Sequence, residues 1–309
     1  MSGEEKTDAL SHERGVMDRA GAAELMGLLA VFLLGLALRA LALHSESLWY
    51  DEVVSANMAS APLIDLLLGR VRDQGNPAGY YALLKLWISM FGGSDTSMRA
   101  LSVTFGSLTV PAAWLLARVL AFAARGRLAL AAMVALNPPL IFLSREARTF
   151  AVLTTILVVV AWLVERIRLR DRQSDWIAFT AGCIILVHLH YYSFFFVGVL
   201  GVYLLYGMRR TSFAWAKLVG AALIVGLSMV HWLPHLLAQM SQGGTRGDDS
   251  WLLHLFYFPA FALVGHTLAW KSDGQRAVAI AEAALLLGVY LPAAILAFRA
   301  RRLPALPAT

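Results

Sequence analysis

The chain has 309 residues, of which 59% are hydrophobic and only 15% are charged. Soluble globular domains carry about 25% charged residues, so this composition excludes an ordinary water-soluble protein. The net charge of +6 does not indicate nucleic-acid binding, because the basic residues lie in short loops between long apolar stretches, where they set membrane topology.

The apolar residues are gathered in long stretches. A helix needs about 20 mainly apolar residues to cross a bilayer, and several stretches approach or reach that length. In chain order they lie at 23–43, 79–92, 99–117, 128–143, 148–164, 176–189, 191–207, 214–237, 252–270 and 278–298. The sequence therefore predicts an all-α polytopic membrane protein. The single cysteine, Cys183, excludes a disulfide framework.

Clusters of arginine and lysine separate these stretches. They lie at 118–127, 166–172, 209–217 and 299–302. Because basic loops stay on the cytoplasmic side of a membrane, we expect these loops and the polar tail 1–22 to be cytoplasmic. The tail is not predicted to be a cleaved signal peptide, because the apolar stretch after it is long enough to span.

Because the basic loops and the tail are all expected on the cytoplasmic side, an even number of membrane crossings must separate each from the next. Two of the stretches would make that number odd. The stretch 79–92 is too short to span, and 252–270 contains His254, Pro259 and His266. We predict that both lie in the outer membrane interface, which leaves about eight transmembrane helices.

The expected organisation is a cytoplasmic tail at 1–22, a transmembrane domain at 23–298 and a short C-terminal tail at 299–309. The first external loop, 44–98, is much longer than an ordinary connection, and loops of that size are usually functional. It contains the acidic residues Glu46, Asp51, Glu52, Asp65, Asp73 and Asp95.

Two adjacent acids directly follow the first apolar stretch. In SLWYDEVVSA, Asp51 and Glu52 come after Trp49 and Tyr50. Burial and mutual repulsion at the membrane boundary raise a carboxylate pKa, which suits a general base for an acceptor hydroxyl. The alternative is an interfacial aromatic anchor with solvated acids beside it.

Two further segments of this loop carry candidate groups. DQGNPAGYYALLKLW breaks the chain at Asn76 and places Tyr80 and Tyr81 on a short apolar helix with an aromatic belt. Arg99 opens the next span on the outer side, against the positive-inside bias, which indicates a phosphate or carboxylate partner. A snorkelling arginine at a helix end is the alternative.

A turn expected on the same outer face holds a charged cluster. In FLSREARTFAVL, Glu146 lies close to Arg145 and Arg148, and the preceding Pro138-Pro139 pair is expected to bend the incoming helix. The arginines could hold a lipid phosphate, with Glu146 orienting one of them or positioning a metal. A plain polar turn is the alternative.

Histidine and tyrosine residues meet at another outer junction, HLHYYSFF. His188 and His190 are two residues apart and do not share a helix face, which disfavours a metal site. We expect His190 and Tyr191 to line a substrate site or to be structural. The sequence predicts no metal ligands and no cofactor, although a divalent metal is compatible with it.

Taken together, these motifs resemble those of the GT-C glycosyltransferases, in the branch of the protein O-mannosyltransferases, lipid A aminoarabinose transferases and Rgt-type galacturonosyltransferases. The shared features are LW-DE after the first span, P-x-x-YY-LL-LW, R-x-x-S at a span opening and S-x-E-x-R-x-F/Y-A in a turn. They occur in this order over residues 23–200 and more loosely to 298. No motif is specific alone, whereas the ordered set is fairly specific.

The resemblance implies a GT-C-type helical bundle in a bacterial plasma membrane, moving a sugar from a polyprenyl-phosphate donor to a lipid, glycan or protein acceptor outside the cytoplasm. It implies catalytic roles for Asp51 and Glu52. The residues expected to bind the donor are Arg99, Arg148, Glu146, Asn76, Tyr80 and Tyr81. This chain has Val54 and Asn76 where the aminoarabinose transferases carry basic residues that hold the phosphate, so its donor contacts must differ.

Two other function classes are considered. A transporter or flippase predicts ionisable residues near the middle of the spans, and the interior span positions here are nearly free of Asp, Glu and Lys. The chain ends soon after the last apolar stretch, so the second alternative is a truncated, non-catalytic member of the family or a partner subunit of a larger assembly.

Overall fold

The computed structural model describes residues 3–41, 43, 47–71, 76–207 and 212–234, and in these ranges all regular secondary structure is helical. The longer helices are α1 (Gly3–Ala40), α5 (Asp95–Val119), α8 (Phe150–Arg170), α9 (Gln173–Leu189), α10 (Ser193–Gly207) and α11 (Ser212–Ser228). The shorter ones are α2 (Tyr50–Ser60), α3 (Leu63–Leu67), α4 (Gly79–Phe91), α6 (Ala124–Leu136), α7 (Pro138–Ser144) and η1 (Val230–Trp232). The predicted stretches 252–270 and 278–298 and the C-terminal tail lie outside the described residues.

Among the described residues, 4 helices are long and apolar enough to cross a membrane, or up to 5 if the bent pair α6 and α7 is one span. The four are Gly21–Ala40, Asp95–Val119, Phe150–Arg170 and Ala214–Trp232. The predicted spans over α9 and α10 are apolar helices of only 17 and 15 residues. The chain therefore has the helices of a multi-pass membrane protein, with fewer full-length spans described than the sequence predicts.

The proline pair bends the chain where the sequence predicts it. α6 ends at Leu136, and α7 begins at Pro138 with a change of direction of 54°. The Asn137 side chain caps α7, because its Oδ1 accepts a hydrogen bond from the Leu140 N–H at 3.0 Å. The result is a broken span or a re-entrant loop, and its second part, α7, leads into the charged turn.

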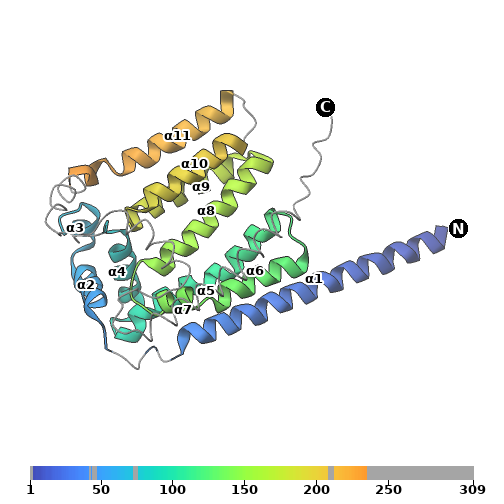
Figure 1. The fold of residues 1–309 in the computed structure, drawn as a ribbon, viewed down its shortest axis with the longest axis horizontal. Coiled ribbons are helices and arrows are strands. Elements are labelled where there is room, and N and C mark those ends of the chain that lie inside the picture. Colours follow the sequence, from blue (N-terminus) through green and yellow to red (C-terminus); the bar gives the residue numbers. More distant parts are fainter. Residues whose placement is uncertain (1–2, 42, 44–46, 72–75, 208–211, 235–309) are drawn as a thin grey trace, which may run out of the picture. The chain divides into compact units, whose positions relative to one another are not determined.

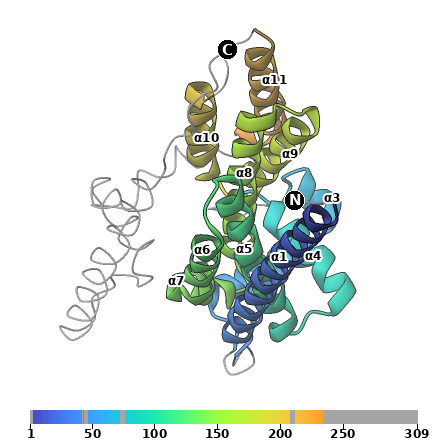
Figure 2. The same cartoon turned by 90° about the vertical axis from the view of Figure 1, so that its right-hand side faces the viewer.

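Helix α5 is the centre of the described bundle. It packs against α1, α6 and α8, while α8 and α11 both pack against α9 (Figures 1 and 2). Between α5 and α8 the hydroxyls of Thr109 and Thr155 lie 2.7 Å apart, and Thr155 Oγ1 also donates to the Phe105 carbonyl at 2.6 Å. Such small polar contacts allow close helix packing inside a membrane.

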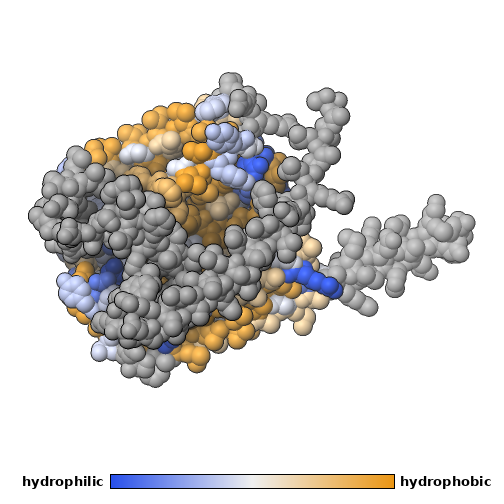
Figure 3. All heavy atoms as spheres, in the orientation of Figure 1, coloured by the Kyte–Doolittle hydropathy of each residue, from blue (hydrophilic) through white to orange (hydrophobic). Residues whose placement is uncertain are grey.

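The outward faces of the helices are apolar. On α1, Leu25, Leu29 and Leu33 are each more than half exposed, and in Figure 3 apolar residues make up most of the coloured surface. Water-soluble proteins rarely expose apolar patches of this extent. Lipid is the environment that these faces match.

Helices α2, α3 and α4 gather at one end of the bundle (Figure 1). α4 has 13 residues and corresponds to the short helix predicted over 79–92. Its first residue, Gly79, packs so closely on α9 that a Cβ atom there would overlap the His188 carbonyl. Helices α2 and α4 carry four of the residues that the sequence nominates as a site, which are Asp51, Glu52, Tyr80 and Tyr81.

Candidate functional site

The two adjacent acids of the first motif open helix α2. Glu52 is the third residue of the helix, and its carboxylate accepts a hydrogen bond from the Trp49 N–H at 3.3 Å. This is the backward contact of a capping box, which satisfies a backbone donor at the helix start. Negative charges in the first turn also interact favourably with the helix dipole, so the DE pair fixes where α2 begins.

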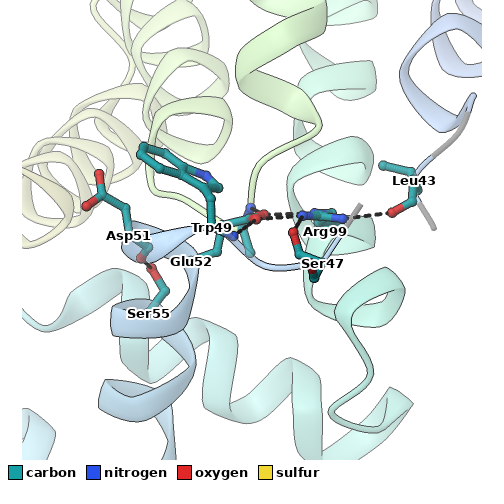
Figure 4. A network of polar contacts seen from close by, with 8 residues as sticks. Leu43, Ser47, Trp49, Asp51, Glu52, Ser55 and Arg99 are labelled. Carbon is teal, nitrogen blue, oxygen red and sulfur yellow. Dashed lines mark hydrogen bonds and ion pairs between the residues drawn. The ribbon is translucent and has the colours of Figure 1, made fainter. Parts of the chain in front are cut away.

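Glu52 is completely buried and forms an ion pair with Arg99 of α5 (Figure 4). Arg99 Nε donates to Oε1 at 2.9 Å, and Nη2 donates to Oε2 at 2.6 Å. The Ala147 N–H, in the turn after α7, donates to the same Oε1 at 2.8 Å. One carboxylate therefore joins α2, α5 and the charged turn.

Arg99 also donates hydrogen bonds to the backbone between α1 and α2. Nη1 donates to the Leu43 carbonyl at 2.9 Å and Nη2 to the Ser47 carbonyl at 3.1 Å. Arg99 is itself buried. The sequence predicts either a phosphate or a carboxylate as its partner, and the resemblance implies the donor phosphate. In the structure the guanidinium contacts protein groups, and one of them is the Glu52 carboxylate.

The environment of Glu52 keeps it ionised. Burial alone would raise the pKa of its carboxyl, but the hydrogen bonds from Arg99, Ala147 and Trp49 outweigh burial and lower the pKa below its ordinary value. A general base needs a pKa near the working pH. Glu52 is therefore suited to holding the site together rather than to accepting a proton.

Asp51 points the other way and is accessible. Its carboxylate lies away from the Glu52–Arg99 pair (Figure 4), and its side chain is 36% exposed. Arg148 Nη2 lies 3.4 Å from Asp51 Oδ2, and Arg148 Nη1 donates to the Asp51 carbonyl at 3.3 Å. The structure thus brings together a carboxylate and a cation from motifs 97 residues apart.

Glu146 lies in the same charged turn and is half-buried. Burial, followed by the negative charge of Glu52, raises the pKa of Glu146 to about 7, with Asp51 adding to the rise and Arg148 opposing it. Within the described part of the chain no hydrogen bond to its carboxylate is found. Glu146 is thus a carboxyl group that is partly protonated at neutral pH.

This shift has a consequence for stability. Folding raises the pKa of Glu146 from 4.5 to about 7, so the folded protein holds this proton more tightly than the unfolded chain. Its contribution to stability is fully present below about pH 4.5 and is lost as the pH rises through about 7. When the pH is raised from about 5 to about 8, the wild type should therefore lose thermal stability. Glu146→Gln has no carboxyl group to titrate at this position, so it should lose less over the same range.

Thermal unfolding of the detergent-solubilised protein across that pH range measures the effect. Asp65→Asn is the matched control, because Asp65 forms an ion pair with the exposed Arg70 at 2.9 Å, and such pairs contribute little to stability. Parallel pH profiles of the wild type and Glu146→Gln would contradict the assigned titration.

Asn76, Tyr80 and Tyr81 lie behind the charged groups. All three are buried, and both tyrosines belong to the main hydrophobic core. Burial raises the pKa of the Tyr80 hydroxyl, so this group stays protonated at neutral pH. These residues support the site from within the bundle rather than forming its open surface.

His190 lies beside the charged turn, while Tyr191, the next residue, packs partly buried against the main hydrophobic core. The ring of His190 is 6.1 Å from Phe150 and stacks on Tyr192 at 5.0 Å, while Arg148 lies over the Phe150 ring at 5.8 Å. Thr149 Oγ1 also donates to the Leu189 carbonyl at 3.3 Å. The end of α9 is thereby tied to the turn, next to the Asp51–Arg148 pair.

The described residues contain no group of three or more His, Cys, Asp or Glu side chains that could hold a metal ion. His188 instead stacks on His231 of η1, with ring centroids 6.0 Å apart. Its Nδ1 lies 2.9 Å from the Ile184 carbonyl. These contacts give His188 a structural role, packing the end of α9 against η1.

Sequence reasoning missed one buried cation, Arg39. It lies in the last turn of α1 with no exposed surface. A lone arginine within a predicted span is a signal of function or of a special structural need.

No protein-family model matches this chain, and no curated protein does. Any assignment of function therefore depends on the residues and contacts described above.

Proposed function

We propose that this chain is a GT-C-type membrane glycosyltransferase with about eight spans, acting at the extracytoplasmic face of a bacterial plasma membrane. It moves a sugar from a polyprenyl-phosphate donor to a lipid, glycan or protein acceptor. The observation that carries the proposal is the pairing of accessible Asp51 with Arg148. A base for the acceptor and a cation for the donor phosphate are thereby adjacent.

The proposed reaction is a single displacement. Asp51 takes the proton of the acceptor hydroxyl while that oxygen forms a bond to the anomeric carbon. The bond between the anomeric carbon and the phosphate oxygen breaks, and its electron pair leaves with the polyprenyl phosphate. Arg148 stabilises the charge of the departing phosphate. One base without a covalent intermediate leads to inversion of configuration.

The buried pair of Glu52 and Arg99 has a supporting role in this mechanism. It joins α2 to α5 and to the Ala147 N–H, and so keeps Asp51 and Arg148 within reach of each other. Productive geometry of this kind contributes a large part of enzymatic rate enhancement.

Among the described candidate spans, the charged residues favour a transferase over a transporter. Arg39 lies in the last turn of α1, Arg99 in the outer part of α5 and Arg118 in its last turn. A transport site would place ionisable residues near the middle of the bilayer.

The proposal is tested by incubating purified protein with polyprenyl-phosphate sugars and measuring released polyprenyl phosphate. Movement of the intact lipid-linked sugar across a vesicle membrane, without bond cleavage, would instead establish a flippase.

Donor binding gives a more specific prediction. We expect Arg148→Ala to weaken binding of a polyprenyl-phosphate sugar by about 1.5–3 kcal/mol, the range for hydrogen bonds to charged groups. Titration of purified protein with the donor measures this effect. Arg70→Ala is the control, because Arg70 also lies outside the candidate spans and its ion pair with Asp65 is exposed. Unchanged donor affinity in a folded Arg148→Ala protein would remove Arg148 from the donor site.

A further inference from the structure

Arg39 is a buried cation whose hydrogen bonds all go to neutral groups. It has no exposed surface, and none of the ion pairs among the described residues includes it. Burying an arginine in a membrane span is costly unless its donors are satisfied. The acceptors that it contacts therefore indicate what it does.

Two of these acceptors are backbone carbonyls at the end of α6. Arg39 Nη2 donates to the Val134 carbonyl at 3.1 Å, and Nη1 donates to the Ala135 carbonyl at 2.9 Å. Nη1 also donates to the Gly35 carbonyl of its own helix at 3.0 Å. The guanidinium thus connects the end of α1 to the end of α6.

These two carbonyls are the ones that the proline pair leaves without helical partners. In an α-helix the carbonyl of residue i accepts from the N–H of residue i+4, which for Val134 and Ala135 falls on Pro138 and Pro139. Proline has no N–H, and a buried carbonyl left without a donor is costly. Arg39 donates to both carbonyls and so stabilises the break between α6 and α7.

Arg39 also contacts the far end of α7. Its Nε donates to Ser144 Oγ at 3.3 Å. Gly106 of α5 allows Ser144 to lie there, since a Cβ atom at position 106 would overlap the serine hydroxyl. Ser144 ends α7 and directly precedes the turn that carries Glu146 and Arg148.

We propose that Arg39 is a positioning residue for the transferase reaction, holding the bent α6–α7 span so that its charged turn lies against Asp51. This inference depends on the proposed function for its kinetic readout. The planar fork of arginine reaches the Val134 and Ala135 carbonyls and Ser144 at once, whereas a lysine ammonium has its three donors on one nitrogen and cannot reach such separated acceptors together.

The kinetic test combines Arg39→Leu with restored backbone donors. Arg39→Leu should lose thermal stability and about 10²-fold in kcat, since displacement of a catalytic group by about 1 Å has effects of that size. Adding Pro138→Ala and Pro139→Ala should restore stability, because both N–H groups return, but should leave kcat low because the span straightens. Recovery of both stability and kcat in the triple variant would show a purely structural role and overturn the proposal.

Two further variants complete the kinetic series. Arg39→Lys keeps the charge but gathers its donors on one nitrogen, and should be intermediate in both measurements if Arg39→Leu folds poorly. Arg118→Leu is the matched control, because Arg118 is exposed at the opposite end of α5 and lies over the Trp114 ring at 5.5 Å. It should keep wild-type kcat, and an equal loss there would overturn the assignment to Arg39.

A second measurement is independent of activity. Nitroxide labels on cysteines at the exposed positions Val53 of α2 and Phe142 of α7, in a Cys183→Ser background, report the distance between the two parts of the site. Arg39→Leu should shift or broaden this distance distribution, whereas Arg118→Leu should not. An unchanged distribution overturns the positioning role. A shifted distribution in a protein that never transfers sugar would support positioning and reject only the proposed function.

Discussion

Replacing Asp51 with asparagine is expected to lower turnover on a hydroxyl acceptor by about 10²–10⁴-fold, the range for loss of a general base. Asparagine has nearly the same shape but cannot accept the proton. Donor binding should change little, because Arg148 keeps its hydrogen bond to the Asp51 backbone carbonyl. Steady-state turnover and donor titration of the same purified protein separate the two effects.

Asp65→Asn is the matched control for this substitution. Asp65 lies in the neighbouring helix α3, and its carboxylate pairs with Arg70 at 2.9 Å rather than with Arg148. Its loss should leave turnover within about twofold of the wild type, as for an exposed pair of small energetic value. A folded Asp51→Asn enzyme with near-normal turnover would end the base assignment. An acceptor that is already ionised, such as a phosphate, would need no base and would give the same result.

Much of the helical architecture could be predicted from residue patterns. Apolar stretches of nearly span length correspond to α1, α5 and α8, and the Pro138-Pro139 pair predicts the break between α6 and α7. The break between α9 and α10 was also predicted, since the stretches 176–189 and 191–207 part at His190, but the short length of the two helices, 17 and 15 residues, was not. Composition records hydrophobicity, whereas the end of a helix depends on local hydrogen bonds.

The individual roles within the site were harder to predict. Asp51 and Glu52 are adjacent in a helix and so point about 100° apart, but the sequence does not say which of them faces α5. The structure buries Glu52 and exposes Asp51. Arg99 was expected to need an anion, and its partner is this carboxylate. The role of Arg39 was not predicted, because two of its acceptors are backbone carbonyls. Every residue has a backbone carbonyl, so a sequence motif cannot identify these partners.

Replacing Glu52 with glutamine is expected to cost about 3–5 kcal/mol of stability, the range for breaking a buried ion pair by removing one partner. Arg99 would be left as a buried charge without its carboxylate. A loss of this size corresponds to roughly 5–8 °C in the unfolding temperature of a chain of this length. Thermal unfolding in detergent measures it, with Asp51→Asn as the matched control, since that carboxylate is partly exposed.

The double variant Glu52→Met/Arg99→Met separates stability from positioning. Apolar residues of similar size often replace a buried ion pair without loss of stability, so the double variant should recover part of what Glu52→Gln loses. Its turnover should stay low, because the Ala147 N–H and the Leu43 and Ser47 carbonyls lose the partners that join the turn and the loop to α5. Wild-type stability in Glu52→Gln would contradict the buried pair, whereas full turnover in the double variant would show that Asp51 and Arg148 meet without it.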